Sequence, residues 1–328
     1  VGGFIGTVDF DPSANTANMI SSSSTVADLY IAKYDSNGNY VWSKQIIGTI
    51  GARRKLVFDT LGNIYFTGTF SGNNPIDVDP SANVFNLTPN GLSNTYVIKF
   101  NTQGDLVWAK SLVPVNLGNF VSVTQFDIKN NNLYITGRFL GGVDFNPSAT
   151  ETNTLTTIIA QSNETFFAKY DLDGNYQMAF KFDNDPAGLI NKGSSFAIDD
   201  NGDIYLLAIF IDTVDFEPSP TGTFNLTSVP DDTTFNLAIL KYTVNGSFVW
   251  AKQVRAVDVD SFLPVTSIQG NEWLSSTYIK NNELIVASSI FGNFDFDPSA
   301  NDAILPSSLD ASGNFNSSFF IAKYNTTT

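Results

Sequence analysis

The apolar positions of the chain come in short runs that predict β-strands. Segments such as YVWSKQI at 40–46 and IYFTGTF at 64–70 are rich in the β-branched and aromatic residues that favour extended backbone. Glycine and proline interrupt the runs at close intervals, and apolar residues do not recur with the helical period of about 3.6 residues. The pattern therefore predicts an all-β protein built from antiparallel strands.

An acidic phrase occurs five times along the chain. Each copy reads Asp, a hydrophobic residue, a second residue with a side-chain oxygen, Pro and Ser, and the copies lie at 9–13, 77–81, 144–148, 215–219 and 295–299. Their first residues are 68, 67, 71 and 80 positions apart, so the chain has an internal repeat. A repeat of this kind predicts that each copy forms one supersecondary unit.

Two further patterns keep the same period. An apolar strand with a lysine is present in every copy, at 30–34, 96–100, 166–170, 238–242 and 320–324. In four copies a tight turn and an aromatic-rich strand follow it, and the turns contain Gly38, Gly104, Gly174 and Gly246. Glycine tolerates the positive φ that such a hairpin turn requires. Before the four later acidic phrases the sequence predicts a pair of strands, at 56–70, 126–139, 196–210 and 277–291.

Each repeat thus predicts four antiparallel strands, which we call inner, second, third and outer in chain order. A repeated four-stranded sheet of this size is typical of a β-propeller blade. We expect a single β-propeller domain or fragment, with a partial blade at 1–50, blades at 51–115, 120–185 and 193–256, and a partial blade at 273–328. Because the first copy lacks an inner strand and the last lacks an outer strand, we expect a longer parent with further blades.

The repeat resembles a known family. The segments YIAKYDSNGNYVWSKQI and VFDTLGNIYFTGTFSG are similar to the SBBP β-propeller repeat of large secreted and cell-surface bacterial proteins. The variant with VDFDPSA resembles copies in Bacteroidetes proteins that are exported by type IX secretion. The resemblance implies an extracellular or cell-surface location and leaves the activity open. The last copy departs from the pattern, because Ile285 stands where earlier copies have Tyr65, Tyr134 and Tyr205.

The acidic phrase is the first candidate for chemistry. In an extended strand its first and third residues point to one face, so each copy presents two oxygen-bearing side chains together. These residues are Asp9, Asp11, Asp77, Asp79, Asp144, Asn146, Asp215, Glu217, Asp295 and Asp297. One interpretation is a calcium ion in each blade, although Ca²⁺ needs about six to eight oxygen ligands. The other is a turn that the first Asp caps through backbone N–H groups, with the proline ending the strand.

Lysine and tryptophan also recur with the repeat. An unpaired ammonium inside an apolar strand is costly, so each lysine should reach the strand edge or meet a carboxylate, for which the repeated Asp is a candidate. These lysines are Lys33, Lys99, Lys169, Lys241 and Lys323. Trp42, Trp108 and Trp250 share one position, where the copy at 120–185 has Met178. Because the position is periodic, packing between blades is favoured over a platform for stacking sugars.

Composition excludes several function classes. The chain of 328 residues has no cysteine and no histidine, which excludes disulfides, thiolate or imidazole metal ligands and His-dependent catalysis. With 32 acidic and 17 basic residues its net charge of −15 would repel nucleic acid and anionic membranes. No stretch is long and apolar enough to insert into a membrane.

We therefore expect a non-catalytic interaction, adhesion or scaffold module that binds a protein or carbohydrate at a cell surface, or other domains of its parent. The alternative is a carbohydrate-active enzyme that uses carboxylates of the propeller. Against it, the carboxylates repeat with the blade, whereas an active site needs acids in distinct environments. A binding face is best sought among residues outside the period, which are Arg53, Arg54, Arg138, Arg255 and the segment 271–274 with Trp273.

Overall fold

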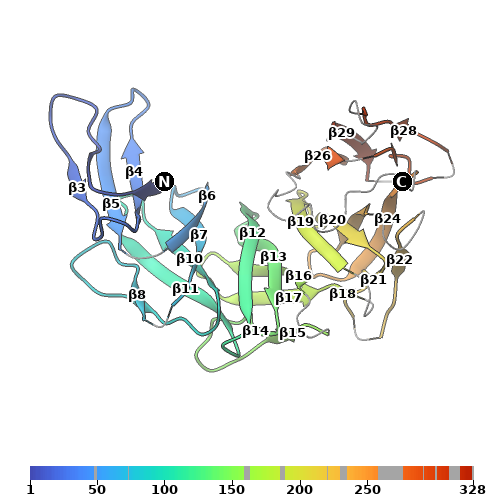
Figure 1. Ribbon diagram of the computed structural model, residues 1–328, viewed down its shortest axis with the longest axis horizontal. Coiled ribbons are helices and arrows are strands. Elements are labelled where there is room, and N and C mark those ends of the chain that lie inside the picture. The colour runs from blue at the N-terminus through green and yellow to red at the C-terminus, as the bar shows by residue number, and fades with distance from the viewer. Residues whose placement is uncertain are drawn as a thin grey trace. The chain divides into compact units, whose positions relative to one another are not determined.

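The computed structural model shows an all-β fold (Figure 1). The structure describes residues 1–47, 50–72, 74–158, 163–184, 189–219, 221–229, 235–257, 276–290, 292–299, 301–309 and 318–326. Within these ranges every regular element is a β-strand, and the strands of the sheets other than β12-β13-β16-β17 pair in antiparallel ladders. The prediction of an antiparallel all-β protein is confirmed. In the described part no helix could span a bilayer.

The chain forms two compact units. The first comprises Val1–Tyr134, Phe139–Thr156 and Lys169–Gln177, and the second comprises Ile135–Arg138, Thr157–Ala168 and Met178–Thr328. One four-stranded sheet contributes residues to both units; its strands are β12 (Phe120–Lys129), β13 (Asn132–Leu140), β16 (Glu164–Asp171) and β17 (Tyr176–Lys181). The blade boundaries expected from the sequence stay predictions.

The first unit contains two large sheets. The N-terminal sheet is made of β1 (Gly2–Phe4), β4 (Asp28–Tyr34) and β5 (Tyr40–Ile46), in that order. The next sheet orders its main strands as in the predicted repeat, β6 (Ile50–Phe58), β7 (Ile64–Phe70), β10 (Asn94–Phe100) and β11 (Leu106–Pro114). These four are the inner, second, third and outer strands, while the N-terminal sheet holds a second, a third and an outer strand.

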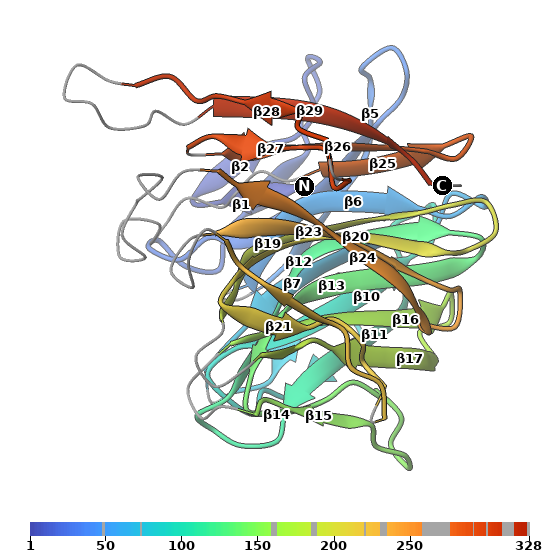
Figure 2. The ribbon, with the colours of Figure 1, turned by 90° about the vertical axis from the view of Figure 1, so that its right-hand side faces the viewer.

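The second unit repeats this arrangement. Its largest sheet is built on β19 (Leu189–Ile198), β20 (Ile204–Ile211), β23 (Asn236–Tyr242) and β24 (Phe248–Ala256), which lie side by side in Figure 2. The last sheet is made of β25 (Ser276–Lys280), β26 (Glu283–Ile290) and β29 (Ser318–Asn325). The two sheets share a core, in which Leu207 and Val254 of one pack with Val286 and Phe320 of the other.

The acidic phrase begins a separate short hairpin in every copy. The five hairpins are β2 (Thr7–Asp9) with β3 (Asn18–Ile20), β8 (Ile76–Asp77) with β9 (Asn86–Leu87), β14 (Gly142–Asp144) with β15 (Thr154–Thr156), β21 (Thr213–Asp215) with β22 (Asn225–Thr227), and β27 (Phe294–Asp295) with β28 (Ile304–Leu305). In the first copy Gly6, with φ of 80°, separates β1 from β2. Such a positive φ breaks an extended strand.

Three of these hairpins pair with the chain of the preceding repeat, and two of them, β14 with β15 and β27 with β28, extend its sheet. Strand β14 pairs with the outer strand β11, and β27 pairs with the outer strand β24. Strand β21 pairs with β18 (Asp183–Asn184), which directly follows the outer strand β17. Backbone hydrogen bonds thus join neighbouring repeats.

The predicted glycine turns are confirmed between the third and outer strands. In the first repeat Oδ1 of Asp35 accepts the backbone N–H groups of Asn37 and Asn39, each at 2.9 Å. The N–H of Gly38 donates to the carbonyl of Asp35 at 3.0 Å, and the φ of Gly38 is 84°. The side-chain amide and backbone N–H of Asn39 are the main groups that lower the pKa of Asp35. The turn therefore closes through the side chain of its first residue.

Two of these turns, those with Gly104 and Gly174, also receive donors from the preceding repeat. The carbonyl oxygen of Leu172 accepts Nζ of Lys99 at 3.1 Å, Nε1 of Trp108 at 3.2 Å and Oη of Tyr65 at 3.3 Å. In the preceding pair of repeats, Lys33 and Trp42 donate to the carbonyl of Thr102 in the same way. Packing of the tryptophans between repeats is therefore confirmed for Trp42 and Trp108.

Lys241 and Lys323 meet carboxylates, as the sequence predicted, but the candidate partner, the repeated Asp, was wrong for both. Lys241 pairs with Asp203 at 3.1 Å and lies 5.2 Å from the ring centre of Tyr205, while Lys323 pairs with Glu283 at 2.8 Å. Asp203 and Glu283 lie at strand ends of the same sheet as the lysine. The carboxylates that meet Lys241 and Lys323 thus come from the lysine's own sheet and not from the acidic hairpin.

A tyrosine near the end of the third strand connects the sheet to the acidic hairpin. Oη of Tyr170 donates to the carbonyl of Phe145 at 2.7 Å, and burial raises the pKa of Tyr170. The same bond forms from Tyr34 to Phe10, Tyr242 to Phe216 and Tyr324 to Phe296. In the second repeat both positions differ, with Phe100 and Val78. The repeats therefore share their strand arrangement but differ in individual side-chain contacts.

The contacts between repeats predict that a Gly→Ala substitution lowers stability by different amounts at two equivalent turn glycines. A Cβ at Gly174 would lie 2.9 Å from Cδ of Lys110 and 3.1 Å from Trp108, whereas at Gly38 it would meet nothing within 4 Å. Both glycines have positive φ, so both Ala variants carry the same backbone strain. We expect Gly174→Ala to lower the free energy of unfolding by about 1–2 kcal/mol more than Gly38→Ala, because of the added crowding.

Urea unfolding followed by tryptophan fluorescence measures the difference between these two variants. An equal loss in the free energy of unfolding for both variants would show that the absence of a side chain at Gly174 contributes nothing to the packing between repeats.

Candidate functional site

The ten predicted site residues lie in the acidic hairpins and mostly bind the hairpin's own backbone. In the third copy Oδ1 of Asp144 accepts the N–H of Asn146 at 3.0 Å and the N–H of Asn153 at 2.8 Å. In the other copies the first residue accepts the two equivalent hydrogen bonds; these residues are Asp9, Asp77, Asp215 and Asp295. One carboxylate oxygen thus ties the two strands of the hairpin to its turn.

The second predicted position caps the next part of the turn. Oδ1 of Asp11 accepts the N–H of Ser13 at 2.9 Å, and Asn146 accepts the N–H of Ser148 at 3.1 Å. Asp79, Glu217 and Asp297 bind the serine of their own copies likewise. A neutral amide performs the same task as a carboxylate, which explains why this position keeps an oxygen but not a charge.

These contacts support the turn-capping interpretation of the acidic phrase. Within the described residues, no three acidic side chains lie close enough together to hold a metal ion. A calcium ion in each blade therefore stays a prediction. Each hairpin offers two oxygen-bearing side chains for it, the first and third residues of the acidic phrase. The Asp and Asn side chains that cap these turns recur with the repeat because every copy contains the hairpin that they close.

The fifth copy adds a cation to its hairpin. Oδ2 of Asp295 accepts Nε of Arg255 at 3.0 Å and Nη2 at 2.7 Å, and Nη2 also lies 3.4 Å from Oδ1 of Asp302. Burial alone would raise the pKa of Asp295, but the N–H of Ala303, the guanidinium of Arg255 and the N–H of Asp297 together lower it. Arg255, predicted as part of a binding face, is thus engaged within the chain.

The other off-period candidates carry less information. Arg138 lies on β13 and is partly buried. The side chains of Arg53 and Arg54, and the segment 271–274 with Trp273, lie outside the described residues.

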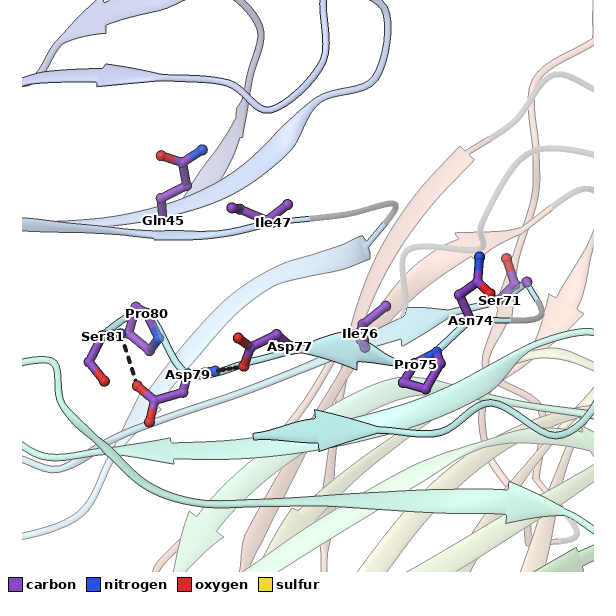
Figure 3. Close-up of a pocket in the computed structure, with 11 residues that line it drawn as sticks. Gln45, Ile47, Ser71, Asn74, Pro75, Ile76, Asp77, Asp79, Pro80 and Ser81 are labelled. Carbon is purple, nitrogen blue, oxygen red and sulfur yellow. Dashed lines mark hydrogen bonds between the residues drawn. The ribbon is translucent and has the colours of Figure 1, made fainter. Parts of the chain in front are cut away.

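A groove beside the second acidic hairpin was not predicted. It has a volume of about 650 Å³ and lies between the end of β5, with Gln45 and Ile47, and the hairpin residues Asp77, Asp79 and Pro80 (Figure 3). Its volume is within the range of ligand sites. No motif marks it in the sequence, because the position of Ile47 is also apolar in the second repeat, where Val113 pairs with Asp144.

The capping bonds predict which substitutions of Asp144 the hairpin tolerates. Asp144→Asn keeps an oxygen for the N–H groups of Asn146 and Asn153, so we expect a small change in stability. Asp144→Ala removes both bonds and should lower the free energy of unfolding by about 1–2 kcal/mol. Thermal unfolding of both variants, with and without millimolar Ca²⁺, measures this. An equal loss for Asn and Ala, together with stabilisation of the parent chain by Ca²⁺, would favour the calcium interpretation instead.

The ion pair of the fifth hairpin predicts a pH-dependent effect of Arg255→Gln. At neutral pH we expect a loss of about 1–2 kcal/mol in the free energy of unfolding, since Arg255 is partly exposed but Asp295 is buried. A carboxylate with a lowered pKa stabilises the fold above its unfolded pKa of about 3.9, and this stabilisation is lost as the pH falls through the folded value.

The difference between Arg255→Gln and the parent chain should therefore shrink as the pH is lowered below about 4. Urea midpoints between neutral and acidic pH check this expectation. A difference that stays constant down to acidic pH would mean that the charge of Asp295 contributes nothing through Arg255.

Comparison with known proteins adds to the assignment of the fold. No family model matches the chain. The chain is 25% identical over 210 residues to an uncharacterized WD repeat-containing protein of Acanthamoeba polyphaga mimivirus, and the match covers 57% of this chain. The matched region spans 14% of that protein's length. Together with the repeated antiparallel sheets, this likeness makes the chain an all-β repeat protein with a β-propeller-like fold.

Proposed function

We propose that the chain is a non-catalytic interaction module that binds protein partners. The observation that carries the proposal is the use of the repeated acids: all ten side chains of the acidic phrases accept hydrogen bonds from their own hairpin backbone. Groups engaged in this way build the scaffold and are poorly placed to exchange protons with a substrate. The likeness to a WD repeat-containing protein supports the same function.

We base the proposed location and parent of the module on a resemblance of its repeat. The resemblance to SBBP-type repeats supports a secreted or cell-surface scaffold or adhesion module within a larger protein of the type IX secretion kind. The match covers only a small share of the WD repeat relative. What the whole parent protein does is therefore also part of this proposal. Protein partners at a cell surface, or other domains of the parent, are the expected ligands, with carbohydrate as the other class.

Selection of a random-peptide display library on the immobilised chain tests the proposal. We expect enrichment of a shared peptide motif and saturable binding of the selected peptide to the chain in solution. In parallel, the chain is incubated with a panel of polysaccharides, and no release of reducing ends is expected.

Two other outcomes have definite meanings. Binding on a glycan array without product formation would retain the interaction module and assign it a carbohydrate ligand. Release of reducing ends that survives purification and is lost on replacing one non-repeated acid would show that the chain is a carbohydrate-active enzyme.

A further inference from the structure

The groove beside the second acidic hairpin occupies a place that backbone pairing fills in later repeats. There the first hairpin strand pairs with the end of the preceding outer strand, as β14 does with β11 through Val113 and Asp144. The equivalent residues of the second hairpin are Ile47, which follows the last residue of β5, and Asp77 on β8. Among the described residues β8 pairs with β9 alone, and β5 pairs with β4. The end of β5 and the strand β8 therefore lie on two sides of the groove without pairing to each other (Figure 3).

The side chains around the groove combine apolar and acidic surface. Ile47 is 57% exposed, which is unusual for an isoleucine directly after a sheet strand. Across the groove lie Asp77 and Asp79, both partly buried, with Pro80 beside them. Oδ1 of Asp77 accepts the N–H groups of Asp79 and Phe85, while none of the described residues donates to its Oδ2. One oxygen of this carboxylate is thus available to a ligand.

The fifth repeat shows what such an oxygen binds in this chain. There Oδ2 of the equivalent Asp295 accepts two N–H donors from the guanidinium of Arg255. Arg255 directly follows the outer-strand residue Val254, and it pairs with Asp295 along the backbone as well. In the first repeat Ile47 holds the position of Arg255 and carries no donor. The second hairpin therefore has the acceptor but lacks the cation.

We propose that this groove binds an extended peptide segment with an arginine, whose guanidinium pairs with Oδ2 of Asp77 while its backbone lies along β8. The net charge of −15 favours a cationic ligand, and Ile47 offers apolar contact to a neighbouring side chain of the peptide. Strand addition to an exposed edge supplies backbone hydrogen bonds, and the acidic pocket supplies specificity. The inference rests on the proposed interaction function and names a site and a ligand chemistry for it.

The chain itself contains a suitable probe. A capped, fluorescently labelled peptide with the sequence KQVRAV, residues 252–257, presents the arginine as it stands beside the fifth hairpin. Titration with the whole chain, followed by fluorescence anisotropy, should show saturable binding that an unlabelled copy competes away. The same peptide with citrulline in place of arginine keeps the shape but removes the charge, and we expect its affinity to be at least about tenfold lower.

Matched variants of the chain locate the bound peptide. Asp77→Asn keeps the oxygen that caps the hairpin and should weaken binding of the arginine peptide about tenfold. Asp144→Asn is the control, because Asp144 caps an equivalent hairpin whose strand already pairs with β11. It should leave the affinity unchanged. Ile47→Arg gives the groove its own guanidinium and should weaken peptide binding as well, while circular dichroism verifies that all three variants remain folded.

Three outcomes would overturn the inference: no saturable binding at millimolar peptide, equal affinity for the arginine and citrulline peptides, or equal weakening by Asp77→Asn and Asp144→Asn. The failure of this inference and that of the interaction function can be told apart. If library-selected peptides bind the chain and are unaffected by Asp77→Asn and Ile47→Arg, the module binds partners elsewhere and the groove assignment is wrong. If neither the library nor the KQVRAV peptide yields binding, both proposals fail.

Discussion

The hydrogen bond from a backbone N–H group to the side-chain oxygen at the start of a turn is the interaction on which the rest of this structure depends. A sheet of short strands has many turns, and each turn leaves backbone donors that must be satisfied. Asp35 does this between a third and an outer strand, and Asp144 does it in an acidic hairpin. Because the caps are local, each repeat can close its hairpins with its own residues.

The same constraint explains the acidic composition. Aspartate and asparagine at turns recur with every repeat, so the excess of acids over bases grows with the number of repeats. The caps also lower the pKa of individual carboxyl groups, as the N–H groups of Ala17 and Asp11 do for Asp9. Many acids in this chain are therefore structural, and a surplus of carboxylates is by itself weak evidence for catalysis.

Function in such a scaffold arises where the repeats differ. Arg255 pairs with Asp295 in the fifth hairpin, whereas a groove lies between Ile47 and Asp77 of the second hairpin. Tyr170 bonds to the hairpin of its own repeat, whereas Phe100 lacks the hydroxyl to do so. These differences leave the order of the inner, second, third and outer strands unchanged. A repeat architecture thus separates residues that maintain the sheet from residues that shape a binding surface.

The sequence by itself determined the strand class, the repeat and the glycine turns such as Asp35 to Gly38, because these depend on alternation, period and hydrogen bonds between near neighbours. The tertiary structure decided the rest. The partner of Trp108 is the carbonyl of Leu172, and the hairpin at Asp144 pairs with a strand of the preceding repeat. The groove at Asp77 likewise depends on how Ile47 and the hairpin are placed. Such contacts join residues far apart in the chain. They depend on strand register and sheet packing, and no local pattern of residues encodes either of these.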